Sequence, residues 1–359
     1  MHPPLDHIVH LNRSLDDNID RRKFIRLDRN EWVEPPQNTD FEQFKKELKP
    51  EDFSAYPNPS QLYKNLSQQT KLDQNFFMAT NGSDAAIRAI FLCYIERGDS
   101  IAQLSPSYAM YEVYANLFRA KTLKVDFENG PNLPFEKLIH LIEQKPKVLF
   151  LANPNQPTGT ILNKDQELQV VQLTQENNVI LVADEAYYPF HDRSFIKYIQ
   201  EGWKHVIVVR SFSKAFGLAG LRLGYTIADP VISKSLLKTQ GLHEVNSVAI
   251  RIGSYLLQNN AVIVEFMNCI QKGNQYLKTK LEPRGFQMPQ TYCNFQLLKV
   301  PETFDLKEIS EFLKSEGYLI RLFDHPCLSN FMRITLAGEP IMKGFAETLL
   351  RFPSINNQK

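Results

Sequence analysis

A lysine stands in a serine- and glycine-rich segment that directly follows an apolar run. The segment Ser211–Gly217 (SFSKAFG) places Lys214 just after Val206–Val209. Open α/β sheets bind their ligands in the loops beyond the carboxyl ends of their strands. Arg222, eight residues further on, can offer a phosphate the planar fork of its guanidinium. Either residue alone would read as a surface charge, but the surrounding glycines and serines favour a binding site.

A carboxylate ends a second apolar run and needs a partner there. Asp184 follows Val179–Ala183, so its side chain lies at the end of an expected buried strand. An unpaired carboxylate in such a place is costly and tends to take up a proton. A pyridinium nitrogen held by aspartate is the arrangement that pyridoxal phosphate (PLP) enzymes use. A helix N-cap is an equally good interpretation of this segment alone.

Two further segments that follow apolar runs contain residues suited to ligand contacts. Residues Ala79–Asp84 (ATNGSD) open an expected helix, and the N–H groups at a helix start attract phosphate. Residues Asn153–Gly159 (NPNQPTG) form a turn whose amides can face a ligand. Each segment is also compatible with an ordinary helix cap or turn, so neither defines a site by itself.

The elements that must position these residues follow from the alternation of short apolar runs with helix-length amphipathic segments. This alternation predicts a mostly parallel sheet covered on both faces, a three-layer α/β arrangement. The expected strands are Phe76–Ala79, Ser100–Leu104, Thr122–Phe127, Val148–Ala152, Val179–Ala183, Val206–Val209 and Leu223–Ile227. The expected helices among them include Asp84–Ile95, Tyr108–Phe118, Lys164–Gln175 and Ile232–Thr239.

The pattern predicts an N-terminal arm over residues 1–40, a large domain over 41–244 and a smaller α+β domain over 245–359. A long helical region, Val245–Leu281, is interrupted near Asn259 and Asn260. The strands expected after it are Asn294–Lys299, Leu319–Leu322 and Phe331–Thr335, and the helices are Leu306–Ser315 and Ile341–Arg351.

Composition limits the partners and the compartment. The 41 lysines and arginines balance 40 acidic residues, so no basic excess indicates a nucleic-acid partner. The four cysteines are scattered, and no metal-binding, P-loop or dinucleotide-binding motif is present. Neither a signal peptide nor an apolar run of membrane-spanning length is visible. We therefore expect a cytoplasmic protein without a metal ion.

Five motifs occur in the order typical of class I/II aminotransferases, and the chain most resembles the histidinol-phosphate aminotransferase branch. The motifs are Asn81–Asp84 (NGSD), Pro106–Tyr111 (PSYAMY), Asn153–Gly159 (NPNQPTG), Asp184–Tyr187 (DEAY) and Ser211–Tyr225 (SFSK…GLRLGY). The resemblance extends from Arg26 to Thr335. It implies the PLP-dependent transferase fold of the aspartate aminotransferase type, with PLP as the cofactor.

The resemblance also implies roles for individual residues. Lys214 would bind the cofactor as a Schiff base and move the substrate's Cα proton. Asp184 would pair with the ring nitrogen and Tyr187 would bond the phenolic oxygen. The other implied cofactor contacts are Gly82, Ser83, Asp84, Tyr108, Asn155, Gln156, Ser211, Ser213 and Arg222.

Substrate contacts and a subunit contact are implied in the same way. Arg333 would grip the substrate's carboxylate or phosphate, Arg321 would supply a second anion contact, and Asn30 would also face the substrate. Tyr56 would reach the cofactor phosphate from the neighbouring subunit. A homodimer with shared active sites is therefore expected.

Three departures from the family pattern leave the reaction open. Gln156 stands where the family usually has asparagine, and His243-Glu244 occupies a stretch that usually contains proline. Trp32 and Glu34 alter the N-terminal motif, either as part of a modified substrate mouth or as neutral changes in a surface loop.

We expect amino transfer between an amino acid and a keto substrate. The alternative is a PLP enzyme without net transfer, namely a phospho-amino-acid decarboxylase or an eliminating cyclase acting on a hydroxylated guanidino amino acid such as hydroxyarginine. A binding module without catalysis is disfavoured, because four residues are retained together, Lys214, Asp184, Tyr187 and Arg222.

Overall fold

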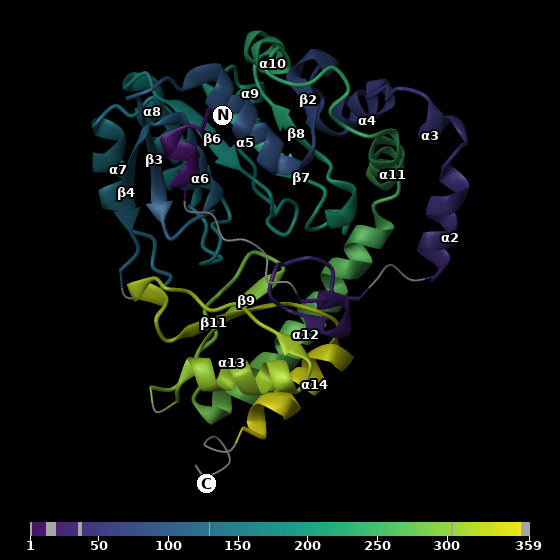
Figure 1. Ribbon diagram of the computed structural model, residues 1–359, viewed down its shortest axis with the longest axis vertical. Helices are drawn as coiled ribbons and strands as arrows, with labels where there is room; N and C mark the ends of the chain where they lie inside the picture. The colour runs from purple at the N-terminus through teal and green to yellow at the C-terminus, as the bar shows by residue number, and fades with distance from the viewer. Residues whose placement is uncertain (1, 12–18, 35–37, 129, 303, 353–359) are drawn as a thin grey trace.

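A seven-stranded sheet forms the centre of the larger part of the molecule in the computed structural model, which describes residues 2–11, 19–34, 38–128, 130–302 and 304–352 (Figure 1). In spatial order its strands are β2 (Phe77–Thr80), β8 (Gly224–Ile227), β7 (Val206–Ser211), β6 (Ile180–Asp184), β5 (Val148–Ala152), β3 (Ser100–Ser105) and β4 (Lys121–Asp126). Strand β8 is antiparallel to both of its neighbours, and the other pairings are parallel. The predicted, mostly parallel sheet is confirmed.

Successive strand residues point into two different apolar layers. On β5, Leu149 and Leu151 join one buried cluster, whereas Val148 and Phe150 join the other. Both faces therefore exclude water, which explains why the strands are continuous apolar runs. One layer contains α5 (Gly82–Tyr94), α6 (Met110–Phe118) and α10 (Pro230–Leu237). The other contains α4 (Ser60–Thr70), α7 (Phe135–Glu143), α8 (Lys164–Glu176), α9 (Ile196–Gln200) and α11 (Ser247–Gln258).

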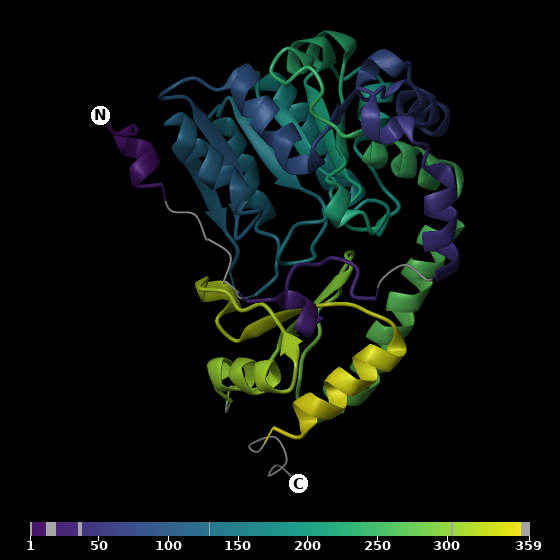
Figure 2. The same ribbon diagram turned by 45° about the vertical axis from the view of Figure 1, so that its right-hand side comes forward.

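A smaller α+β part lies below the sheet in Figures 1 and 2. Strands β9 (Phe295–Lys299) and β11 (Phe331–Thr335) form an antiparallel pair. Strands β1 (Ile25–Arg26) and β10 (Tyr318–Leu319) form a parallel pair. They pack with α12 (Ala261–Leu281), α13 (Leu306–Ser315) and α14 (Glu339–Leu350) around a separate apolar cluster. The helices α1 (Asp6–Val9), α2 (Asn38–Glu47) and α3 (Glu51–Ser54) precede the sheet in the chain.

Differences from the expected elements concern mainly their ends and the N-terminal segment. The helical break appears where it was expected, because α11 ends at Gln258 and α12 begins at Ala261. The strand expected over Leu319–Leu322 is shorter, since β10 ends at Leu319. The segment expected to be an arm contributes β1 and the buried Leu27 to the smaller part. Apolar side chains of α11 join the core of the sheet. The domain boundaries at residues 40 and 244 stay predictions.

The register of the sheet brings the expected functional loops together. Asp184 at the end of β6 lies beside Ala152 at the end of β5 and beside Val209 on β7. The loops that follow these three parallel strands therefore emerge at the same edge of the sheet. Within the described ranges, no helix has the length and apolar character needed to cross a membrane.

Candidate active site

A pocket of about 120 Å³ opens where the loops after β5, β6 and β7 meet. A second cavity, of about 420 Å³, adjoins it and shares Tyr108, Gln156, Tyr187 and Lys214 with it. We call the first the inner pocket and the second the outer cavity. The inner pocket is lined by Ser83, Asp84, Tyr108, Ala152, Pro154, Gln156, Asp184, Ala186, Tyr187, Ser211, Ser213, Lys214 and Arg222. Most of the residues expected to bind the cofactor are in this set.

Lys214 lines both the inner pocket and the outer cavity. Its Nζ donates a hydrogen bond to the carbonyl oxygen of Arg29 at 3.0 Å. Burial, reinforced by the positive charge of Arg333, lowers the pKa of Lys214 to about 8. A neutral amine is therefore readily accessible near physiological pH, as a lysine nucleophile requires.

Asp184 is buried and held in place by two donors. The hydroxyl of Tyr111 donates to Asp184 Oδ2 at 2.6 Å, and the backbone N–H of Ala186 donates to Oδ1 at 3.0 Å. Burial raises the pKa of Asp184 to about 6 despite these bonds. Tyr111 was not among the expected site residues, although it stands three residues after Tyr108 in the same motif. Its place in that motif was the available signal.

The opposite end of the inner pocket is suited to a phosphate. Helix α5 begins at Gly82, and Ser83 at its first turn lines the pocket. The guanidinium of Arg222 lies over this helix start and bonds Ser213 Oγ at 3.3 Å. Gly82 has a φ of +77°, and a Cβ there would lie 2.6 Å from Arg222 Nη2. Only glycine lets the guanidinium approach the helix end so closely.

Tyr187 is positioned by a residue from the N-terminal segment. Asn30 Nδ2 donates to the Tyr187 hydroxyl at 2.7 Å. The backbone of Asn30 is fixed in turn, because its N–H bonds Thr335 Oγ1 at 2.9 Å and its carbonyl accepts from Asn294 at 3.0 Å. Asn30 also lines the outer cavity. It therefore contacts both Tyr187, which lines the inner pocket, and the outer cavity.

Two arginines face the outer cavity from directly opposed positions. Arg321 and Arg333 are bridge partners, which places their side chains on the same side of the pairing. Arg333 is buried and donates from Nη2 to the Asp28 carbonyl at 2.6 Å. Its Nε and Nη1 have no protein partner within the described part of the chain. Burial lowers the pKa of Arg333 to about 10, yet it remains cationic at neutral pH. Unpaired cationic donors of this kind fit an anionic substrate group.

Several expected contacts lie elsewhere. Asn155 stands behind the pocket wall, where it bonds Ser107 and Thr158 at 2.8 Å. Tyr56 is 81% exposed and stacks on His243, away from the inner pocket. Glu244 pairs with Arg88 at 3.4 Å. His243 and Glu244 line neither the inner pocket nor the outer cavity of this chain, and their loop lies beside α10 and α11.

Trp32 and Glu34 do not form a modified substrate mouth either. Trp32 Nε1 donates to the carbonyl oxygen of Lys214 at 2.8 Å, and its ring packs against Gly217. Glu34 accepts from the backbone N–H of Gly338 at 3.0 Å. Neither residue lines the inner pocket or the outer cavity. Through these bonds Trp32 connects the N-terminal segment to the Lys214 loop, and Glu34 connects it to Gly338.

The inner pocket fits the three polar parts of PLP. An arginine, three serines and a helix start suit its phosphate, a reactive amine suits its aldehyde, and a buried carboxylate suits its protonated ring nitrogen. A group of three or more His, Cys, Asp or Glu side chains that could hold a metal ion is absent from the described residues. The donor set therefore matches an organic phosphate cofactor with a basic ring.

This fold and site define a PLP-dependent enzyme. The chain belongs to the aminotransferase class I and II family, whose model matches residues 36–342, and PLP is its cofactor. It is 32% identical over 291 residues to a histidinol-phosphate aminotransferase of Clostridium novyi, covering 80% of each chain. It is also 32% identical to one of Thermoanaerobacter pseudethanolicus, covering 84% of this chain and 87% of that one.

Solved structures confirm the fold. Histidinol-phosphate aminotransferase from Sinorhizobium meliloti, in complex with PLP, superimposes with a TM-score of 0.86 at 21% identity, covering 98% of this chain and 96% of that one. L-threonine-O-3-phosphate decarboxylase from Porphyromonas gingivalis gives a TM-score of 0.75 at 22% identity, covering 92% and 99%. The predicted fold class, family and cofactor are thus confirmed.

The pH dependence of cofactor binding tests the role of Asp184. Its pKa of about 6 means that Asp184 is protonated below that pH and no longer attracts a cationic ring nitrogen. The deprotonated fraction of Asp184 falls from about one half at pH 6 to about one tenth at pH 5, so we expect the dissociation constant of the apoenzyme for PLP to rise about fivefold over that range from this residue alone. Spectroscopic titration of wild type and Asp184→Asn side by side measures it, because other titrating groups are common to both proteins. Parallel pH profiles would contradict the assignment.

Proposed function

We propose that the enzyme transfers an amino group between a phosphate-bearing amino substrate of the histidinol-phosphate type and a keto acid. The observation that carries this proposal is the buried Arg333 beside Arg321 in the outer cavity, with two guanidinium nitrogens that have no partner among the described residues. A phosphate dianion matches two adjacent arginines better than a single carboxylate does. The names of the relatives at about 30% identity support the same substrate class.

We assign the protein side of the reaction to four residues. When bound, PLP draws electrons from the substrate's Cα–H bond. Lys214 Nζ takes the Cα proton and returns one, since it reaches both the inner pocket and the outer cavity. Asp184 keeps the ring nitrogen protonated. Tyr108 covers the pocket, and Arg333 orients the substrate's anionic end.

A second candidate reaction is decarboxylation or cyclisation without amino transfer. Gln156 supports this second candidate, because the residue lines both cavities at the position where the family usually has asparagine. Its amide lies one methylene further from the backbone than that of asparagine. A changed contact at the ring would alter which bond to Cα breaks.

We also propose a cytoplasmic homodimer in which Tyr56 reaches the partner's cofactor phosphate. Tyr56 is 81% exposed, and Leu242 in the neighbouring loop is 92% exposed. Large apolar side chains left open to solvent are typical of surfaces that another subunit covers. Sedimentation of wild type and Tyr56→Phe tests the assembly, since the phenylalanine variant should remain dimeric. A PLP titration of the same two proteins tests the tyrosine, since the variant should lose cofactor affinity.

A substrate panel tests the proposed function. We expect histidinol phosphate to convert the enzyme to its pyridoxamine phosphate form, with at least about a hundredfold higher kcat/KM than histidinol, because the arginine pair binds the phosphate. Absorbance follows the cofactor, and mass spectrometry identifies the products. Release of carbon dioxide, or of a cyclised guanidino product, without pyridoxamine phosphate would instead establish the second candidate.

A further inference from the structure

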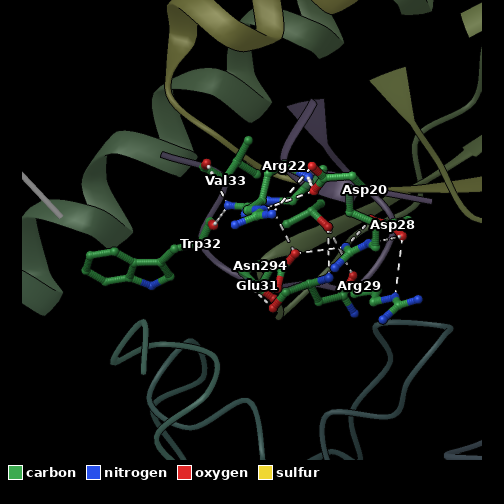
Figure 3. A network of polar contacts seen from close by, with 12 residues as sticks. Asp20, Arg22, Asp28, Arg29, Glu31, Trp32, Val33 and Asn294 are labelled. Atoms are coloured by element: carbon green, nitrogen blue, oxygen red, sulfur yellow. Dashed lines mark hydrogen bonds and ion pairs between the residues drawn. The ribbon is translucent and has the colours of Figure 1, made fainter. Parts of the chain in front are cut away.

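A short strap of the N-terminal segment, residues Asp28–Trp32, contacts several parts of the site. The Asp28 carbonyl accepts from Arg333 and the Arg29 carbonyl accepts from Lys214 Nζ. The strap is itself held by a charged network in which Arg21 bonds Asp28 at 2.6 Å and Glu31 at 2.8 Å. Figure 3 shows the strap among these charges, with the indole of Trp32 directed away from them. Its position is therefore well fixed on the smaller part of the molecule.

Trp32 joins this strap to the main chain of Lys214. Its Nε1 donates to the Lys214 carbonyl at 2.8 Å, and its ring stacks on Phe266 of α12 with centroids 4.1 Å apart. The same ring occupies the space where a Cβ of residue 217 would lie, at 2.5 Å. Gly217 has a φ of +68°, so a side chain there would also strain the backbone. The indole thus fills a gap between the strap, α12 and the Lys214 loop.

We propose that Trp32 is a positioning residue that fixes the main chain of Lys214 and thereby the reach of its amine. The inference rests on the proposed role of Lys214. A lysine side chain has four rotatable bonds, so the place of its amine depends on how firmly its backbone is held. Trp32 supplies a side-chain hydrogen bond to that backbone, from a residue 182 positions away in the chain. Trp32 lines neither cavity, so it acts on the reaction indirectly, and its hydrogen bond to the Lys214 carbonyl is its direct link to the inner pocket.

Trp32→Phe tests this inference, because it keeps an aromatic ring for Phe266 and loses the N–H donor. We expect kcat to fall about fivefold while KM stays within about twofold, since Arg321 and Arg333 are untouched. The rate at which added PLP becomes fixable by borohydride on the apoenzyme should fall by a similar factor. Trp32→Ala, which also removes the stacking, should lower both rates further.

The matched control is Trp203→Phe, since Trp203 is the chain's other tryptophan, packs partly buried against the core of the sheet and lines neither cavity. Peptide mapping first locates the borohydride adduct in wild type. An adduct at Lys214, with equal attachment rates and kcat in Trp32→Phe and Trp203→Phe, would overturn the role of Trp32 alone. An adduct at another residue would overturn both this inference and the proposed role of Lys214.

Discussion

Replacing Lys214 by alanine is expected to lower kcat by at least about a thousandfold, because the variant lacks both the amine that links to the cofactor and the base beside Cα. PLP should still bind without a covalent link, since Asp184 and Arg222 remain at the two ends of the inner pocket. Steady-state kinetics measure the loss of kcat. Borohydride treatment followed by peptide mapping tests for the loss of the covalent link, and no adduct should form.

Lys204→Ala is the control for this experiment, because Lys204 is an exposed lysine in the segment before β7 and lines neither cavity. Its kcat and its borohydride adduct should match those of wild type. Turnover within tenfold of wild type in Lys214→Ala would show that the proton at Cα moves by another route, and the proposed mechanism would be wrong.

Arg333→Met is expected to lower kcat/KM for a phosphate-bearing substrate by about a hundredfold to a thousandfold. The substitution removes a buried cation whose Nε and Nη1 have no partner among the described residues. Loss of a buried pair between such a cation and the substrate's anion costs about 2–5 kcal/mol. The same variant should act on an analogue without the phosphate about as well as wild type does. Arg333→Lys should recover only part of the loss, because an ammonium lacks the guanidinium fork.

Two comparisons make the Arg333 experiment specific. Arg284→Met removes an exposed arginine from the same part of the molecule and should leave kcat/KM unchanged. Arg333 also lowers the pKa of Lys214, so cofactor attachment in Arg333→Met should require a higher pH than in wild type. Equal losses for substrates with and without phosphate would show that Arg333 supports the fold or the cofactor rather than the substrate's anion.

Much of the fold follows from the sequence because its signals are local. The runs Val148–Ala152 and Val206–Val209 are apolar at every position, which identifies strands buried on both faces. The break near Asn259 separates two helices as expected. The inner pocket was predictable for the same reason, since Lys214 and Asp184 each follow a parallel strand and such strand ends meet at one edge of the sheet.

The sequence could not predict contacts between segments that are far apart. Tyr111 reaches Asp184 across 73 positions, and Asn30 reaches Tyr187 across 157. These pairings depend on the direction of each side chain and on how the helices and the N-terminal segment pack against the sheet. The motif spacing contains neither kind of information. Residues such as Trp32 could therefore be recognised as unusual without their role being apparent.

The sequence by itself determined the sheet, the family and the chemical types at the two ends of the inner pocket. Periodicity and turn residues report burial and local backbone shape, and a parallel sheet then gathers its loops at one edge. The tertiary structure alone decided that Trp32 meets the Lys214 main chain, that two nitrogens of Arg333 have no partner in the described part of the chain, and that His243 is exposed. These outcomes depend on packing between distant segments, which no local pattern encodes.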